Sequence, residues 1–412
     1  MMNNSAWNWN SEKRQIADIG KVKTSYEEVH EWVASPDGER IAVPVMIERP
    51  DTVGICINGA TVEKEFERAW QLKYGPDGRL AALVRMDDEW TVAVDGVPWE
   101  ETFDFAWDIK FSDNGEKIAV QVKQDPKYAI AVNGEAWETG FLSIRDYVLS
   151  ADGSKVAATV QVEQLAEGDI FKFMEGTWSV AVDGAAWDEK FINVYAPRIS
   201  ADNGRVAVEI RTDIQEYTAC INGRSWDSKY GCIWEPSYRP DGKLILPVKT
   251  ATGWTLAQDD ELLWTKRYVQ AWQQVVAPNG NGVAAVVAPG YGQWTVAVDD
   301  KPWKATFNDM VDKPVFSADS NHVAAAVKHD NRWGMAVDGR ASRDTFDMVW
   351  DPVLAPDGSV VAAKVEKNGK YAVAVNGKTI GQGCEAIWNP TFSSDGKKLL
   401  IRAIEDLSLI HI

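Results

Sequence analysis

The chain has 412 residues, with 43 basic and 61 acidic side chains and a formal net charge of −18. Its 45% hydrophobic and 25% charged residues are a globular mixture, which excludes wholesale disorder. Because it holds 20 Trp but only 4 His and 4 Cys, it cannot carry several haems, iron–sulfur clusters or zinc sites. The acidity argues against nucleic acid as a partner and against direct docking on an anionic membrane surface.

The N-terminal stretch 1–21 is polar and lacks the apolar run of a signal peptide. No run of about 18 apolar residues occurs, so we expect no direct membrane insertion. The cysteines are far apart and form no CxxC pattern, which predicts four reduced thiols and a cytoplasmic location. They are Cys56, Cys220, Cys232 and Cys384.

The first predicted strands lie at 14–26, where the sequence resembles the third and fourth strands of a repeat. From residue 35 onward, a tight-turn signal of the type PDG, DNG or ADG recurs with a period near 38 residues. The ten turns lie at 35–38, 75–78, 112–115, 150–153, 201–204, 239–242, 277–280, 317–320, 355–358 and 393–396.

Each repeat is predicted to form four short strands. In the third repeat they are 107–112, 116–123, 128–132 and 136–142, and Asn133-Gly134 is predicted to make a two-residue hairpin turn. No stretch has convincing helical periodicity, so we expect little helix. The same hairpin signal recurs at 58–59, 95–96, 183–184, 222–223, 338–339 and 376–377.

Four antiparallel strands per repeat predict an all-β fold, a β-propeller of about ten blades over residues 1–406. A sandwich or a solenoid is the weaker alternative. We expect one closed ring, in which 14–26 completes a last blade begun by 384–405; two tandem five-blade rings stay open. Acidic residues of the turns are expected to stabilise those turns: Asp37, Asp77, Asp152, Asp241 and Asp357.

Two segments depart from the repeat. One is an insertion at 164–176, in which Phe171 and Phe173 could cover a loop or dock a partner. The other is the end of the chain, LSLIHI (407–412), which does not continue the pattern and matches the translation of a common sequencing adapter. We expect this tail to be an assembly artefact; the alternative is a short apolar tail packed on the body.

Seventeen of the 20 tryptophans fall into three series of repeat positions. Most are expected to pack between blades. The first series lies on the strand before each turn and could form an aromatic docking surface near a channel mouth. Its members are Trp70, Trp107, Trp234, Trp272, Trp350 and Trp388. The second series is Trp90, Trp178, Trp254, Trp294 and Trp333, with Tyr128, Tyr217 and Tyr371. The third is Trp99, Trp137, Trp187, Trp226, Trp264 and Trp303.

The sequence lacks a G-x-S-x-G elbow, a P-loop, a Rossmann glycine pattern and HExxH, so we predict no catalytic residues and no bound cofactor or metal. The recurring WTVAVDGxxW (90–99, and 294–303 with Asp300 for Gly) and the WDxxFSxxG-like strands resemble the TmcD-like, tryptophan-rich subunit of the Tmc transmembrane redox complex of sulfate-reducing bacteria. The resemblance covers nearly the whole chain except the tail.

The resemblance implies a non-catalytic accessory or scaffold subunit on the cytoplasmic side of a membrane electron-transfer complex that serves sulfate reduction. Its implied partners are a multihaem cytochrome c, an iron–sulfur subunit and a membrane cytochrome b. A stand-alone peptide- or protein-binding propeller and a propeller hydrolase are the alternatives. A hydrolase would need unlike polar residues converging at one channel mouth, whereas the sequence is repetitive.

Overall fold

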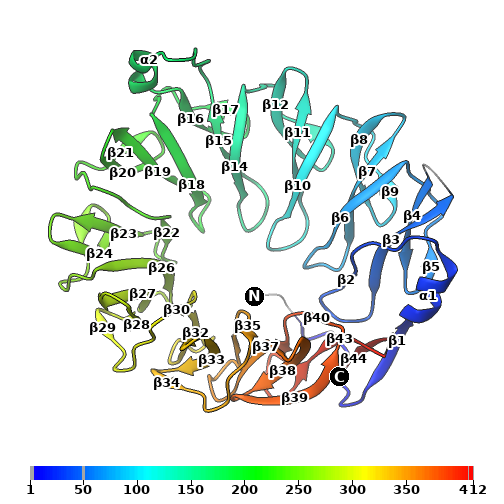
Figure 1. The fold of residues 1–412 in the computed structure, drawn as a ribbon. Coiled ribbons are helices and arrows are strands. Elements are labelled where there is room, and N and C mark those ends of the chain that lie inside the picture. The colour runs from blue at the N-terminus through cyan, green and yellow to red at the C-terminus, as the bar shows by residue number, and fades with distance from the viewer. Residues whose placement is uncertain (1–3, 49–51, 407, 412) are drawn as a thin grey trace. The chain divides into compact units, whose positions relative to one another are not determined.

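The structure is a computed structural model that describes residues 4–48, 52–406 and 408–411. The chain divides into two compact units. Unit 1 comprises 13–199 and 408–411, and unit 2 comprises 4–12 and 200–406, within the described ranges. In each unit, small antiparallel sheets follow one another along the chain (Figure 1). We call each four-stranded sheet, with any short extra strand, a blade.

Unit 1 contains blades 1 to 4, flanked by three further strands and a helix. Its elements are β1 (Arg14–Asp18), α1 (Ile19–Ser25); blade 1 with β2 (Val33–Ala34), β3 (Ile41–Glu48), β4 (Thr52–Ile57) and β5 (Ala60–Thr61); blade 2 with β6 (Arg68–Tyr74), β7 (Leu80–Met86), β8 (Glu89–Val94) and β9 (Val97–Pro98); blade 3 with β10 (Phe105–Phe111), β11 (Ile118–Gln124), β12 (Lys127–Val132) and β13 (Glu135–Ala136); blade 4 with β14 (Ser143–Leu149), β15 (Val156–Gln161), α2 (Ile170–Glu175), β16 (Trp178–Val182) and β17 (Ala185–Ala186); and β18 (Asn193–Ile199) and β44 (Ser408–His411).

Unit 2 repeats the same plan. Its strands are β19 (Val206–Asp213), β20 (Glu216–Ile221), β21 (Arg224–Ser225), β22 (Ser237–Tyr238), β23 (Leu244–Thr250), β24 (Gly253–Gln258), β25 (Glu261–Leu262), β26 (Gln270–Val276), β27 (Val283–Gly290), β28 (Gln293–Val298), β29 (Lys301–Pro302), β30 (Met310–Val311), β31 (Val315–Phe316), β32 (Val323–His329), β33 (Arg332–Val337), β34 (Arg340–Ala341), β35 (Met348–Val349), β36 (Val353–Leu354), β37 (Val361–Lys367), β38 (Lys370–Val375), β39 (Lys378–Cys384), β40 (Ala386–Ile387), β41 (Thr391–Phe392), β42 (Leu399–Leu400) and β43 (Arg402–Glu405).

The β-propeller fold is confirmed at the level of its blades, in which the strands pair antiparallel from the first to the fourth; the fourth strand is short in most blades, whereas β39 has 7 residues. The predicted low helix content is also confirmed, since α1 and α2 have 7 and 6 residues. Fourth strands are shorter than predicted: 136–142 is reduced to β13 and an isolated bridge from Phe141 to Tyr128. The single closed ring of about ten blades stays a prediction.

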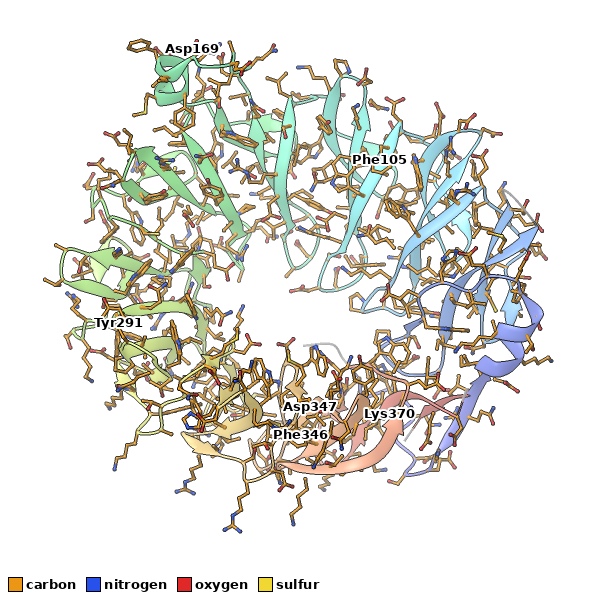
Figure 2. All side chains as sticks on the ribbon, in the orientation of Figure 1. Phe105, Asp169, Tyr291, Phe346, Asp347 and Lys370 are labelled. Atoms are coloured by element: carbon orange, nitrogen blue, oxygen red, sulfur yellow. The ribbon has the colours of Figure 1, made fainter. Side chains whose placement is uncertain are left out.

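The cores lie between successive blades, and this explains why the second and third strands have no polar face. Side chains fill the space between the sheets of unit 1 (Figure 2). Ile118 and Val120 of β11 pack with Leu83 of blade 2, whereas the intervening Ala119 packs with Val156 of blade 4. Both faces of a blade are therefore buried, as the short apolar runs of the repeat require.

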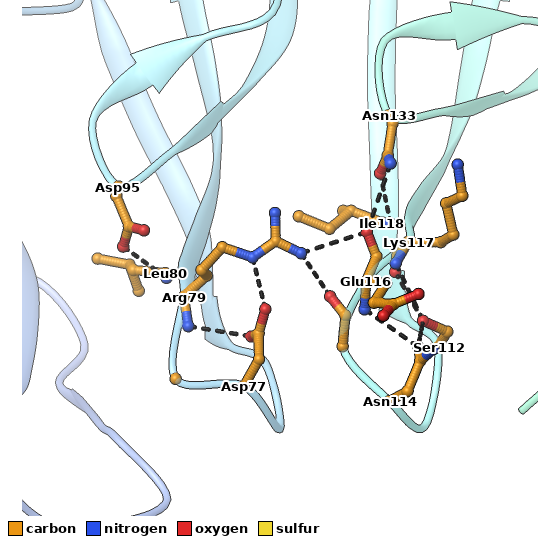
Figure 3. A network of polar contacts seen from close by, with 12 residues as sticks. Asp77, Arg79, Leu80, Asp95, Ser112, Asn114, Glu116, Lys117, Ile118 and Asn133 are labelled. Carbon is orange, nitrogen blue, oxygen red and sulfur yellow. Dashed lines mark hydrogen bonds and ion pairs between the residues drawn. The ribbon is translucent and has the colours of Figure 1, made fainter. Parts of the chain in front are cut away.

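Asn and Asp of the hairpins have two roles (Figure 3). Asn133 adopts a φ of 50° beside Gly134 at 92°, the left-handed pair that a type I′ turn needs. Its Oδ1 also accepts a 2.8 Å hydrogen bond from the backbone N–H of Ile118, at the start of the second strand. The other predicted hairpins have the same pair of positive φ angles.

The acidic residues of the tight turns stabilise those turns, as predicted. Asp77 Oδ1 accepts a hydrogen bond of 3.0 Å from the N–H of Arg79 (Figure 3). The other four make the same bond to the residue two positions on. The Arg79 side chain then donates to the carbonyl of Gly115 in blade 3, so the turns also join neighbouring blades.

Two sequence predictions of local structure are wrong. The turn predicted at 201–204 closes one residue earlier: Asn203, with a φ of 57°, donates to the carbonyl of Ser200, and Gly204 is outside the left-handed region. In 14–26 only β1 is a strand, because Asp18 caps helix α1 by accepting a bond from Lys21 N–H.

The insertion and the tail have defined places. The 164–176 segment lies between β15 and β16 and contains α2. Ser408–His411 forms β44, antiparallel to β1 of the same unit, with Arg14 opposite His411. Leu407 and Ile412 lie outside the described residues. This pairing does not test the origin of 407–412, which stays a prediction.

Candidate aromatic docking site

The first-series tryptophans lie on or near the first strand of a blade: Trp70, Trp107 and Trp272 are within it, Trp350 and Trp388 follow it directly, and Trp234 lies three residues before it. Trp70, Trp107 and Trp272 precede a residue at positive φ, and the strand register shifts at each of them. Such a bulge changes the direction in which neighbouring side chains point. The corrected turn at Ser200–Asn203 moves the equivalent position in β18 to Tyr195, an aromatic residue that the sequence indexing missed.

Five of the six first-series indoles contact a ring of the second series in their own blade. The closest pair is Trp272 and Trp294, whose ring centroids are 4.9 Å apart with planes 13° from parallel. The others are Trp70–Trp90 at 5.5 Å, Trp107–Tyr128 at 5.9 Å, Trp234–Trp254 at 5.7 Å and Trp350–Tyr371 at 5.8 Å. Trp388 makes no ring contact among the described residues.

Two of the six indoles are well exposed, Trp70 at 45% and Trp234 at 37%. Trp107, Trp272, Trp350 and Trp388 are half-buried. Trp70 and Trp107 belong to unit 1 and the other four to unit 2. A partner-binding role for all six stays a prediction, and within unit 1 the structure brings only Trp70 and Trp107 together.

Third-series tryptophans pack between blades, as predicted. A Cβ built on Gly134 would lie 3.3 Å from the Trp99 ring of the preceding blade. The same contact joins Gly184 to Trp137 and Gly339 to Trp303. The hairpin glycine thus meets two requirements, a positive φ and space for an indole.

An aromatic cluster crosses from blade 2 to blade 3 in unit 1. The ring of Phe105 lies 5.5 Å from Trp90, 6.0 Å from Trp70 and 5.8 Å from Trp107. Phe105 is 37% exposed and is labelled in Figure 2. Sequence reasoning missed it because the repeat has no aromatic there; the available signal was its i, i+2 spacing from Trp107, which puts both rings on one face of β10.

A groove of about 660 Å³ lies beside Trp70, and we name it the Trp70 groove. Its walls include the first- and second-series positions of blades 1 and 2, which are His30, Val53, Trp70 and Trp90. Where the other blades of unit 1 have a pair of large side chains, blade 1 has a histidine and a valine. The groove is therefore the space that the missing rings leave in the aromatic row.

Charged groups line the Trp70 groove on two sides. Glu31 is exposed and follows His30 in sequence, and Glu28 Oε1 lies 4.0 Å from His30 Nε2. Arg68 lines the groove from β6, the strand that also carries Trp70, and donates a 2.9 Å bond from Nη1 to the carbonyl of Glu67. The groove combines an apolar aromatic floor with carboxylates on its His30 side.

The predicted docking element in the insertion is partly exposed. Phe171 of α2 is 87% exposed, whereas Phe173 is half-buried. The loop is anchored by Glu163, whose carboxylate contacts Lys190 Nζ at 2.9 Å and Lys172 Nζ at 3.0 Å. Hydrogen bonds from these two ammonium groups lower the pKa of Glu163.

Glu209 of β19 is the described carboxyl with the clearest change in acidity. Burial, together with the negative charge of Glu235, raises its pKa to about 7. Burial also raises the pKa of the Cys232 thiol, and the negative charge of Glu209 adds to this increase. Among the described residues no three or more His, Cys, Asp or Glu are grouped as metal ligands, and none of the four cysteines is in a disulfide.

Neither helix of the described chain is long and apolar enough to cross a membrane.

No family model and no curated protein sequence matches the chain. It is similar to solved structures, among them two that are described as propellers. One, described as the eukaryotic initiation factor, has 11% identity and a TM-score of 0.48 over 88% of this chain and 98% of that chain. The Dos1 propeller has 13% identity and a TM-score of 0.43 over 74% and 91%. The β-propeller domain of the Trilobed protease from Pyrococcus furiosus has 14% identity and a TM-score of 0.32 over 66% and 94%. At these values the similarities carry no information about what this chain binds.

Proposed function

We propose that the chain is a non-catalytic β-propeller that binds a protein partner through the Trp70 groove and the adjoining face of Phe105. The observation that carries this proposal is an exposed indole beside a groove, continuous with a second exposed ring. Exposed Trp is enriched at binding hot spots, because a large flat ring buries much apolar area at little entropic cost.

The finer part of the proposal is the identity of the partners. The resemblance to the TmcD-like subunit supports a scaffold of a membrane-associated electron-transfer complex. Its partners would be a multihaem cytochrome c, an iron–sulfur subunit or a membrane cytochrome b. In this proposal the chain lies on the cytoplasmic side and is held at the membrane by those subunits. A stand-alone binding propeller is the competing proposal.

The test is capture of partners from the membranes of the organism that encodes the chain. The tagged full chain is expected to retain haem or iron–sulfur polypeptides, identified by mass spectrometry and haem absorbance. The double variant Trp70→Ala/Phe105→Ala is expected to lose about 90% or more of them, the consequence of removing 2 kcal/mol or so of hot-spot energy.

The matched control is Tyr291→Ala, which removes an aromatic ring that is 91% exposed in unit 2, outside the groove. It should retain the captured proteins. Capture of proteins without haem or clusters, abolished by the double variant, would support the stand-alone proposal and contradict the redox one. Capture that survives the double variant would contradict docking at the groove.

A further inference from the structure

The Trp70 groove has an occupied counterpart within unit 1. In blade 4 the first-series position holds Arg145 in place of Trp. Its guanidinium carbon lies 4.1 Å from the ring centroid of Trp178, the second-series residue of blade 4, and 4.6 Å from that of Tyr195, the first-series residue on β18. The slot between neighbouring aromatic positions therefore accommodates a guanidinium.

Hydrogen bonds fix the orientation of that guanidinium. Arg145 Nη1 donates to the carbonyl of Val194 at 3.0 Å, and Nη2 to Asn193 Oδ1 at 3.4 Å. Val194 is the residue before Tyr195. Ala69, the residue before Trp70, has the corresponding position in blade 2 and lines the Trp70 groove. The groove thus presents an aromatic face with a backbone segment beside it, whereas Val53 and Arg68 stand at the positions of Trp178 and Asn193.

Blade 1 has neither arginine nor lysine at this position. His30 stands where blade 4 has Arg145, and its shorter side chain leaves the groove open above Trp70. Carboxylates stand on that side instead: Glu31 lines the groove, and Glu28 lies within 4.0 Å of His30. Arg68, two residues before Trp70 on β6, would repel a cation beside it, so the carboxylate of Glu31 is the group that favours a cation in the groove.

We propose that the Trp70 groove binds an arginine side chain of the partner, stacked on Trp70 and paired with Glu31. A guanidinium stacks on an indole face and matches a carboxylate with two N–H donors, which an ammonium cannot do equally well. The net charge of −18 favours the approach of a basic partner segment. This inference rests on the proposed docking function and specifies the chemistry of its ligand.

The probe is the amidated tripeptide Arg-Arg-Arg, with Lys-Lys-Lys as its counterpart. Binding to the full chain is followed by the imidazole signals of His30, one of only four His, and by tryptophan fluorescence. We expect the arginine peptide to shift the His30 signals and to bind about 5-fold more tightly than the lysine peptide. Trp70→Ala should weaken it about 10-fold and Glu31→Gln about 3-fold, with Trp70→Phe in between.

The control variant is Tyr291→Ala, because this ring is 91% exposed in unit 2 and does not line the Trp70 groove. It should leave binding unchanged. Equal affinity for the two peptides, unchanged His30 signals, or full binding by Trp70→Ala would each overturn the arginine site. Loss of captured proteins in Trp70→Ala without arginine binding would overturn this inference alone. If Trp70→Ala captures as much partner protein as the parent chain, the docking function is overturned. The peptide titration would then still decide whether the arginine site exists.

Discussion

At the scale of single residues, Glu209 links the fold to pH. Its carboxyl is held in β19, where burial raises the pKa to about 7 from an ordinary value near 4.5. The folded state therefore binds a proton more tightly than the unfolded state does. That contribution to stability is fully present below about pH 4.5 and is lost as the pH rises through about 7.

Glu209→Gln should reveal this loss, because the amide resembles the protonated acid and cannot ionise. We expect the variant to be more stable than the parent at pH 8 by about 1–3 kcal/mol, and nearly equal to it at pH 5. Urea unfolding at the two pH values measures the difference. Glu216→Gln changes an exposed carboxyl of β20 and is the control; an equal gain there, or none for Glu209→Gln at pH 8, would contradict the prediction.

Asp300 shows how one residue departs from the repeat with a structural reason. Like Asp260, it stands where most of the hairpins have glycine, and it adopts a φ of 62°. Its carboxylate accepts hydrogen bonds from the N–H groups of Thr265 and Lys266, at 2.9 and 3.0 Å, in the loop after β25. These hydrogen bonds join two blades of unit 2, and their free energy offsets the cost of the left-handed conformation.

At the scale of elements, the hairpin between β12 and β13 packs on the preceding blade through Gly134 and Trp99. Gly134→Ala should destabilise unit 1 by about 2–4 kcal/mol, since it adds left-handed strain to a steric clash with the indole. Thermal and urea unfolding measure the change.

Gly369→Ala is the matched control for this hairpin. Gly369 has a φ of 71° in the turn between β37 and β38, and a Cβ there would meet nothing within 4 Å. It should cost only the backbone strain, about 1 kcal/mol. Equal costs at Gly134 and Gly369 would show that the indole contact contributes nothing.

The sequence predicted local structure correctly where a backbone conformation is accessible to only a few residue types. Asn133-Gly134 predicted a hairpin because few other residues adopt two positive φ angles in succession. Prediction from the sequence failed where two local structures compete. Asp18 is compatible with a hairpin and with a helix cap. The DNG sequence at 202–204 can close a turn in either of two registers. The Trp70 groove could not be predicted from the sequence, because His30 and Val53 of blade 1 form it together with residues of blade 2.

At the scale of the whole molecule, the acidity has a structural correlate. Several basic side chains donate to backbone carbonyls of a neighbouring blade, and Lys110 does so while it also contacts the carboxylates of Asp108 and Asp146. Lys73 Nζ lies 3.1 Å from the carbonyl of Ile109, Lys110 Nζ 2.7 Å from that of Tyr147, and Arg239 Nη1 3.0 Å from that of Gly280. Part of the positive charge thus joins blades, and the excess of carboxylates repels itself.

Screening should relieve that repulsion. Raising NaCl from about 0.02 to 0.3 M shortens the Debye length from about 20 to 6 Å, so we expect the midpoint of thermal unfolding at pH 7.5 to rise. The control is the same salt series near the isoelectric point of about 4.8, where the rise should disappear. A fall in the midpoint with salt at pH 7.5 would show that attractive ion pairs dominate.

The hairpin Asn side chains described above have a consequence for chemical ageing. Asn-Gly is the dipeptide most prone to deamidation, and it occurs at four of the hairpins that join a third strand to a fourth, at Asn58, Asn133, Asn222 and Asn376. Their Oδ1 atoms accept from the second strand, and at sister hairpins an Asp makes the same bond, as Asp95 does to Leu80 N–H at 3.0 Å. Conversion of these Asn to Asp therefore leaves every blade with the acceptor it needs, whereas conversion to isoaspartate inserts a methylene into the turn and breaks it.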